Sequence, residues 1–183
     1  RPQKNHRMVR PKVLIITHFN FTDFGPIHGP ANSITSYLEK KKIPYTLIGH
    51  PLYSGRKSFI EIFDGEKIRQ KEFGTNLKLP LVAKSFLETV QTLLITWRDK
   101  HTLTVSIDPL NTVPALIFRR VGKTKKLVFY TVDYAEKRFE NPILNFIYHL
   151  LDRLSIFGAD FVWNVSTRIV KKRKKLGLGD RKN

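Results

Sequence analysis

Residues 12–42, KVLIITHFNFTDFGPIHGPANSITSYLEKKK, decide the fold of this chain. The stretch opens at 12–17 with a short apolar, β-branched run that is typical of a buried strand. A segment rich in glycine and proline follows at 24–30, and residues 31–42 have a helical pattern. Because a strand that leads through a loop into a helix is the first part of a β-α-β unit, the stretch predicts an α/β domain with a parallel sheet.

The same alternation continues to the end of the chain. It predicts further strands at 45–49, 103–107, 126–132 and 161–165, and helices at 79–100, 111–121, 142–158 and 168–176. Between Phe59 and Phe73 the apolar period changes to two around Asp64 and Gly65, which predicts an inserted β-hairpin. The fold class is therefore α/β: a three-layer sandwich with a mainly parallel sheet, helices on both faces and an antiparallel hairpin as an appendage.

Two of the predicted helices are amphipathic. In helix 79–100 the apolar residues recur at intervals of three and four, at 79, 82, 86, 90, 93 and 97. In helix 142–158 one stripe contains Ile143, Ile147, Leu150, Leu154 and Phe157. Trp97 lies on the first stripe and Trp163 in a buried-type strand, so we expect both tryptophans to pack in the core.

Composition limits the class of protein. The 183 residues suffice for one ordinary domain, and the absence of cysteine excludes disulfides and cysteine nucleophiles. The net charge of +18 is concentrated at the ends: residues 1–12 hold five Lys or Arg and no acid, and residues 169–183 hold seven with one Asp. This excess favours anionic partners, although a solvated basic tail explains it equally well. No stretch reaches the roughly 18–20 apolar residues of a membrane span, so we expect no transmembrane helix. The lack of cysteine permits a reducing setting, and we expect a cytoplasmic protein.

Polar residues follow every predicted strand of the parallel sheet. They are His18, Asn20, His50, Asp108, Asn111, Asp133, Tyr134, Asn164 and Ser166. In an open parallel sheet, ligands bind beyond the carboxyl ends of the strands, so these side chains are candidates for one site. Each of them alone is better explained as a helix cap or turn residue, but their recurrence after strand upon strand favours a binding site.

The segment 25–33 is a second candidate. Gly25 and Gly29 let backbone N–H groups approach a ligand. The helix that follows begins near Asn32, a few residues after His28, and a helix N-terminus attracts anions. The segment lacks the dinucleotide spacing G-x-G-x-x-G and the Lys-Ser/Thr ending of a P-loop, which disfavours NAD binding and ATPase activity. The six histidines are scattered and no H-E-x-x-H or G-x-S-x-G motif occurs, so we expect no bound metal and no cofactor.

The segment 134–166 resembles the family-4-like glycosyltransferases of the GT-B type. The resemblance rests on Tyr134, Arg138-Phe139, Asn141-Pro142, Asn145, Ile147-Tyr148-His149, Leu151-Asp152-Arg153, Ala159-Asp160 and Trp163-Asn164-Val165-Ser166, together with the strand, loop and helix at 12–42. It implies one Rossmann-like half of a two-domain enzyme, in which the N-terminal domain holds the acceptor and the C-terminal domain binds the nucleotide-sugar donor. Residues 1–183 would be the acceptor-side domain, with the donor domain absent.

The resemblance also implies roles for individual residues. We expect substrate-binding residues at Gly25, His28, Gly29, Asn32, Asp108, Asn111 and Tyr134. Many members have a cleft histidine in a Phe-His-Thr sequence where this chain has Phe129-Tyr130-Thr131, so we expect Asp133, three residues beyond Tyr130, to be the catalytic residue. The implied reaction is hexosyl transfer from a nucleotide-sugar to a hydroxyl of a glycan or lipid-linked acceptor, with peripheral attachment to the inner face of a membrane.

Two alternatives remain open. One is a non-catalytic Rossmann-like module that binds an anionic ligand. The other is a nucleic-acid binder that uses the basic run at 171–175, with aromatic side chains to stack on bases. Because the run specifies no partner and both tryptophans are assigned to the core, nucleic acid is the least favoured partner.

Overall fold

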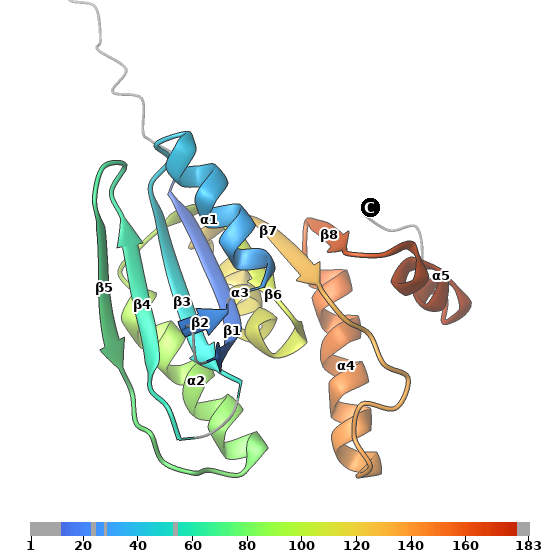
Figure 1. Ribbon diagram of the computed structural model, residues 1–183. Helices are drawn as coiled ribbons and strands as arrows, with labels where there is room; N and C mark the ends of the chain where they lie inside the picture. The colour runs from blue at the N-terminus through green and yellow to red at the C-terminus, as the bar shows by residue number, and fades with distance from the viewer. Residues whose placement is uncertain (1–11, 23–24, 28, 53–54, 179–183) are drawn as a thin grey trace, which may run out of the picture.

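A sheet of parallel and antiparallel strands forms the centre of the molecule (Figure 1). The computed structural model describes residues 12–22, 25–27, 29–52 and 55–178. The strands within these residues are β1 (Val13–Thr22), β2 (Gly25–Ile27), β3 (Tyr45–Pro51), β4 (Ser58–Phe63), β5 (Ile68–Phe73), β6 (His101–Ile107), β7 (Thr124–Thr131) and β8 (Phe161–Asn164). Seven of them lie in the order β5-β4-β3-β1-β6-β7-β8, and β2 pairs with β1.

The parallel part of the sheet consists of β3, β1, β6, β7 and β8. Val13 at the start of β1 lies opposite Tyr45 of β3 and Leu103 of β6, which fixes the register of the three central strands. The chain adds β3 on one side of β1 and later adds β6, β7 and β8 on the other side, so the strand order reverses between β1 and β6. The carboxyl ends of these two strands therefore flank a topological switch point, where open α/β sheets bind ligands.

The predicted hairpin at 59–73 is confirmed. Strands β4 and β5 form an antiparallel pair that extends the sheet beyond β3. Asp64 closes the turn, because its Oδ1 accepts hydrogen bonds from the backbone N–H groups of Glu66 (3.1 Å) and Lys67 (3.0 Å). The prediction of a loop at 24–30 is wrong in part, because residues 25–27 of this segment form β2. This strand pairs antiparallel with the end of β1, which runs to Thr22.

Helices cover both faces of the sheet, as predicted (Figure 1). They are α1 (Pro30–Lys40), α2 (Leu81–Thr96), α3 (Pro109–Arg120) and α4 (Pro142–Gly158). Alternate side chains of β1 enter two separate cores: Val13 and Ile15 pack with α1, whereas Leu14 and Ile16 lie on the side of α3 and α4. The layers are thus α1, the sheet, and α2-α3-α4, which confirms the Rossmann-like three-layer sandwich.

The last helix, α5 (Thr167–Lys175), is attached to the domain by Arg173. This buried guanidinium forms an ion pair with Asp152 of α4. It also donates hydrogen bonds to Asn164 Oδ1 of β8 at 2.5 Å and to Thr131 Oγ1 of β7 at 3.0 Å. A buried arginine without acceptors is strongly destabilising, so the position of α5 depends on these three elements.

The apolar stripe of α2 does not face the core, contrary to the expectation for an amphipathic helix. The buried side chains of α2 are polar and recur every four residues: Lys84, Glu88, Thr92 and Thr96. Val82 and Phe86 of the apolar stripe are exposed, whereas Leu93 packs against the core. The cause is a set of buried hydrogen bonds that hold the polar stripe against the carboxyl edge of the sheet, described below.

Helix α4 has the predicted bounds, but its apolar stripe also faces outward. Ile143, Ile147, Leu150, Leu154 and Phe157 are exposed, and the buried side chains are Tyr148, Asp152, Ser155 and Ile156. The prediction that both tryptophans pack in the core is wrong, because Trp97 ends α2 and Trp163 lies on the edge strand β8, where each is half-exposed. Within the described ranges, no helix combines the length and the apolarity needed to cross a membrane.

We predict that Gly49→Ala destabilises the domain by about 1–3 kcal/mol through overpacking. Gly49 lies opposite Phe59 in the β3-β4 pair, and a Cβ at this position would overlap the Phe59 ring and reach Phe19 at 3.0 Å. The two phenylalanine rings already pack edge to face at 4.8 Å, so neither can move freely. Urea unfolding measures the loss. In the double variant Gly49→Ala with Phe59→Leu the loss should be smaller than the sum of the single variants, and strict additivity would contradict the packing explanation.

Candidate functional site

The side chains that meet at the topological switch point come from four elements. We call this group the switch-point site: His18 on β1, Glu88 on α2, Asp108 after β6 and Asn111 on α3. His18, Asp108 and Asn111 belong to the polar residues that the sequence places after the strands. The parallel strands bring their carboxyl ends to one edge of the sheet. His18 is therefore hydrogen-bonded there to Glu88 and Asn111, which are 70 and 93 positions further along the chain.

Asn111 fixes the orientation of His18. Its Nδ2 donates to the backbone oxygen of Ile107 at 2.7 Å and to Nδ1 of His18 at 2.8 Å. The proton of the neutral imidazole is therefore on Nε2, which faces Oε2 of Glu88 at 3.5 Å. The ring is held in one tautomer by groups from both of its sides.

Glu88 is the inner partner of a buried ion pair. Lys84 lies one helical turn earlier on α2, and its Nζ donates to Glu88 Oε1 at 2.6 Å and to the backbone oxygen of Pro51 at 2.6 Å. Burial opposes the ionisation of Glu88, but hydrogen bonds from His18 and Lys84 outweigh it and lower the pKa of the carboxylate below its ordinary value. The carboxylate is therefore charged and unsuited to take up a proton at neutral pH.

His50 is a structural neighbour of the site. Its Nδ1 is hydrogen-bonded to Ser58 Oγ at 2.8 Å and its Nε2 to Thr92 Oγ1 at 2.8 Å. Burial lowers the pKa of this imidazole from 6.5 to about 3, so the ring is neutral at physiological pH. A cavity of about 10 Å³ lies between His50 and His18, which is room for one water molecule.

Asp108 has an unusual backbone conformation that its neighbours enforce. Its φ of 73° and ψ of 154° lie in a region that is nearly confined to glycine, where a side chain costs about 1–3 kcal/mol. The backbone N–H of Asp108 donates to Tyr130 O of β7 at 3.1 Å. Its carbonyl oxygen accepts from Thr112 N at 3.2 Å and from Thr112 Oγ1 at 2.9 Å. The strain is therefore imposed by β7 on one side and by α3 on the other.

The carboxylate of Asp108 is not used for helix capping. An Asp directly before a helix normally accepts from the first N–H groups, but Asp108 makes no such bond to α3. Its Oδ1 is buried and has no hydrogen-bond partner. Burial raises the pKa of the carboxyl from its ordinary 3.8 to about 6, and the nearby carboxylate of Asp133 adds to this rise.

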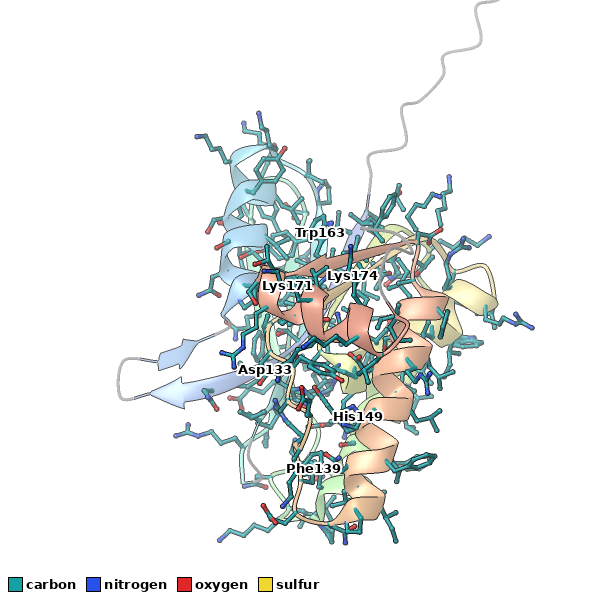
Figure 2. All side chains as sticks on the ribbon, turned by 90° about the vertical axis from the view of Figure 1, so that its right-hand side faces the viewer. Asp133, Phe139, His149, Trp163, Lys171 and Lys174 are labelled. Carbon is teal, nitrogen blue, oxygen red and sulfur yellow. The ribbon has the colours of Figure 1, made fainter. Side chains whose placement is uncertain are left out.

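Asp133 lies near Asp108 but in a different environment. Figure 2 looks onto the β8 edge of the sheet and shows Asp133 at the start of the segment that leads from β7 to α4. Its side chain is 56% exposed and forms an ion pair with Arg138. The Arg138 guanidinium lies 5.7 Å from the ring centroid of Tyr148, whose buried hydroxyl has no hydrogen-bond partner. Burial raises the pKa of the Tyr148 hydroxyl to about 12, so it remains a hydrogen-bond donor.

The other predicted site residues are distributed along the same edge of the sheet. Gly25 lies in β2, Gly29 precedes α1 with a φ of 55°, and Asn32 is exposed in the first turn of that helix. His28 lies outside the described residues. The prediction that this segment shares one cleft with Asp108 and Asp133 remains a prediction.

Tyr134 lines a separate cavity of about 290 Å³. The walls of this cavity are Tyr134, Glu136, His149, Asp152, Arg153, Leu176 and Leu178. His149 Nε2 donates to the backbone oxygen of Glu136 at 2.8 Å, and its ring lies 5.8 Å from that of Tyr134. Tyr134 therefore belongs to the junction of α4 with α5, where the Arg173 guanidinium also lies 5.6 Å from its ring centroid.

The sequence analysis gave no role in the site to Lys84, Glu88, Arg138 or Tyr148. One signal for the first two was present, since a Lys and a Glu four residues apart are the only charged residues in an otherwise apolar and hydroxyl-bearing helix. No pattern marked Arg138 or Tyr148 as neighbours of Asp108. Over the part of the chain that the structure describes, no group of three His, Asp or Glu side chains is placed to bind a metal ion.

We predict that Asp108→Asn stabilises the domain more at neutral pH than at acid pH. With its pKa raised, the carboxyl favours folding while it is protonated, below pH 3.8, and this contribution is lost as the pH rises through about 6. The change from 3.8 to about 6 corresponds to about 3 kcal/mol. Urea unfolding of variant and wild type at about pH 4 and about pH 7.5 should show the advantage of the variant growing by about 2–3 kcal/mol.

Asp133→Asn is the matched control, because this carboxylate is more than half exposed. Its effect on the free energy of unfolding should change much less between the two pH values. An equal pH dependence of both variants would contradict the assignment of the buried charge to Asp108.

No model of a known protein family matches the chain, and no curated protein matches it.

Proposed function

We propose that the chain is the acceptor-side domain of a glycosyltransferase that moves a hexose from a nucleotide-sugar to a hydroxyl group. The observation that supports this best is Asp108 at the switch point of the sheet, whose backbone is strained and whose buried Oδ1 has no hydrogen-bond partner. The fold class and the motif resemblance of residues 134–166 agree with the proposal. A free acceptor atom in a partly buried position fits a ligand hydroxyl, which is the group that a sugar acceptor presents.

Asp108 is suited to receive the proton of the attacking hydroxyl. In the transfer step the acceptor O–H bond breaks, the oxygen bonds to C1 of the hexose, and the bond from C1 to the phosphate oxygen of the donor breaks. The nucleoside diphosphate leaves with the electron pair of the broken bond, and the proton of the acceptor hydroxyl passes to Oδ2 or Oδ1 of Asp108. A pKa of about 6 places this carboxylate near the optimum for a base at neutral pH.

The sequence candidate for catalysis, Asp133, remains part of the proposal in a different role. Its ion pair with Arg138 leaves the guanidinium between Asp133 and the Tyr148 ring, close to the charge of Asp108. A guanidinium at this place would bind donor phosphate oxygens. The N-terminus of α1, with Gly29 at its start, is a second place for a phosphate at the same sheet edge.

We further propose that the enzyme works in the cytoplasm, attached peripherally to the inner face of a membrane. The net charge of +18 favours an anionic surface, and each Lys or Arg near such a surface contributes about 1 kcal/mol. A lipid-linked acceptor would then be presented at the surface to which the protein is bound.

We predict that the 183-residue chain binds acceptor glycosides but transfers sugar only slowly. Alignment of donor and acceptor between two domains accounts for about 7–11 kcal/mol of barrier lowering, which an acceptor domain alone cannot supply. Calorimetry with a panel of short alkyl glycosides should detect binding, and Asp108→Asn should weaken it about tenfold, the loss of a hydrogen bond to a charged group. Rapid release of nucleotide from a nucleotide-sugar by this chain alone would contradict the two-domain proposal.

An extended chain that includes a donor domain separates the two carboxylates. Asp108→Asn should lower kcat by about 10²–10⁴-fold, as expected for the loss of a base, without loss of stability. Asp133→Asn should mainly raise KM for the donor. If Asp133→Asn reduces kcat more than Asp108→Asn does, Asp133 is the catalytic residue, as the resemblance implies.

Polyanion binding is a second candidate, and the edge strand favours it. Phe161 and Trp163 are half-exposed on one face of β8, and the Lys126 ammonium lies 5.9 Å from the Phe161 ring centroid. Exposed aromatic rings with adjacent lysines bind single-stranded nucleic acid by stacking. We expect binding of single-stranded RNA to be weak and to disappear with added salt. Binding that persists at about 0.3 M salt and is lost in Trp163→Ala would favour this candidate over sugar transfer.

A further inference from the structure

We infer that the outer face of the α2-α3-α4 layer docks on an anionic lipid bilayer. Both flanking helices turn polar side chains toward the sheet and apolar side chains away from it. The most exposed are Phe86 (70%) and Leu94 (73%) on α2, and Ile143 (68%) and Phe146 (67%) on α4. An apolar surface of this kind on a globular domain marks an interaction site.

The three helices form one continuous layer. All of them pack on the same face of the sheet, with α3 between α2 and α4 (Figure 1). Leu150 and Leu154 continue the exposed apolar row along α4, and Ile117 is exposed on α3 between the two flanking helices. The surface is therefore about three helices wide, not a single stripe.

The charges on this layer are complementary to anionic lipid. Glu88 and Asp152 are the acidic residues of the three helices, and both are buried in ion pairs on the inner side. Within the three helices, the exposed charged side chains are the basic Arg120 on α3 and Arg153 on α4. Helices whose exposed side chains are apolar or basic are typical of the interfacial region of a bilayer.

The charge also argues against a second copy of the chain as the occupant. In a symmetric dimer, the same apolar and basic surface would face itself, so Arg120 and Arg153 would meet like charges without an acidic partner. The net charge of +18 on each chain adds to the repulsion. An anionic bilayer satisfies both the apolar side chains and the arginines.

This inference deepens the proposed membrane attachment and rests on it. It also gives the distance of the switch-point site from the bilayer, because both lie against the same helix. Glu88 is on the inner side of α2, at the site, and Phe86 is on the outer side, on the docking face. An α-helix with its side chains is about 10–12 Å across, so the bilayer surface lies about one helix diameter from the site. A lipid-linked acceptor anchored in the bilayer could reach Asp108 along the end of α2.

The test is co-sedimentation with vesicles of phosphatidylcholine, with and without phosphatidylglycerol. We expect the wild type to bind the anionic vesicles and to be released by salt. Phe86→Gln/Ile143→Gln, which removes one aromatic and one isoleucine side chain from the docking face, should weaken binding at least about tenfold. Tyr37→Gln/Ile68→Gln removes the same kinds of exposed side chain from the α1 side of the sheet and should bind as the wild type does.

The arginines are tested separately from the apolar residues. Arg120→Gln/Arg153→Gln should weaken binding to anionic vesicles by at least about tenfold and leave the weak binding to phosphatidylcholine unchanged. We expect every variant to fold, because all the substituted side chains are exposed. Circular dichroism and thermal unfolding of each variant check this.

Each result distinguishes the inference from the proposal beneath it. If the wild type does not bind anionic vesicles, the membrane attachment itself is wrong, and this inference falls with it. If the wild type binds but the two apolar double variants are equal, attachment stands and this docking face is wrong. If Phe86→Gln/Ile143→Gln instead converts a dimer into a monomer in analytical ultracentrifugation, the face is a contact between copies of the chain.

Discussion

The buried ion pair between Lys84 and Glu88 determines how the domain is assembled at its carboxyl edge. It turns the polar side of α2 toward the sheet, where Lys84 reaches the end of β3 and Glu88 reaches His18 on β1. A buried pair of this kind is strongly destabilising if one partner is removed, so it selects one rotation of the helix about its axis. With that rotation fixed, His18 lies against Asn111 of α3, and Phe86 and Leu94 face away from the sheet.

Asp108 combines two unfavourable features that a purely structural residue would not retain. Glycine would relieve its backbone conformation, and asparagine would remove the buried charge, yet the chain has Asp at this position. Backbone strain and a shifted pKa at one residue are the pattern of sites where stability has been given up for function. The neighbouring hydrogen bonds to Tyr130 and Thr112 show that the strain is held by the fold and does not arise from a lack of local order.

The sequence predicted the elements well and the orientation of two helices poorly. Strand and helix patterns follow from local periodicity, so β4-β5 and the bounds of α4 could be predicted from the residues. Periodicity shows which side of a helix is apolar, but it does not show whether that side faces the core or the solvent. The usual assumption that it faces the core is wrong for α2 and α4. The polar side of each helix faces inward because of partners that are distant in the chain, such as Arg173 for Asp152. No local sequence pattern predicts such a pairing. For the same reason, the strand-end pattern found Asp108 and Asn111 but not Glu88.

The outward apolar side of α2 and α4 has an energetic consequence. A fully buried Phe or Leu side chain contributes about 1.5–3 kcal/mol relative to an exposed one, and a domain is stable by only about 5–15 kcal/mol in total. Leaving most of Phe86, Leu94 and Phe146 in water thus gives up about 3–6 kcal/mol, a substantial part of the stability of a domain. An exposed apolar surface of this kind marks an interaction site. Since Glu88 on the inner side of α2 contacts His18, the same rotation that completes the switch-point site also exposes the apolar surface that we propose docks on a bilayer.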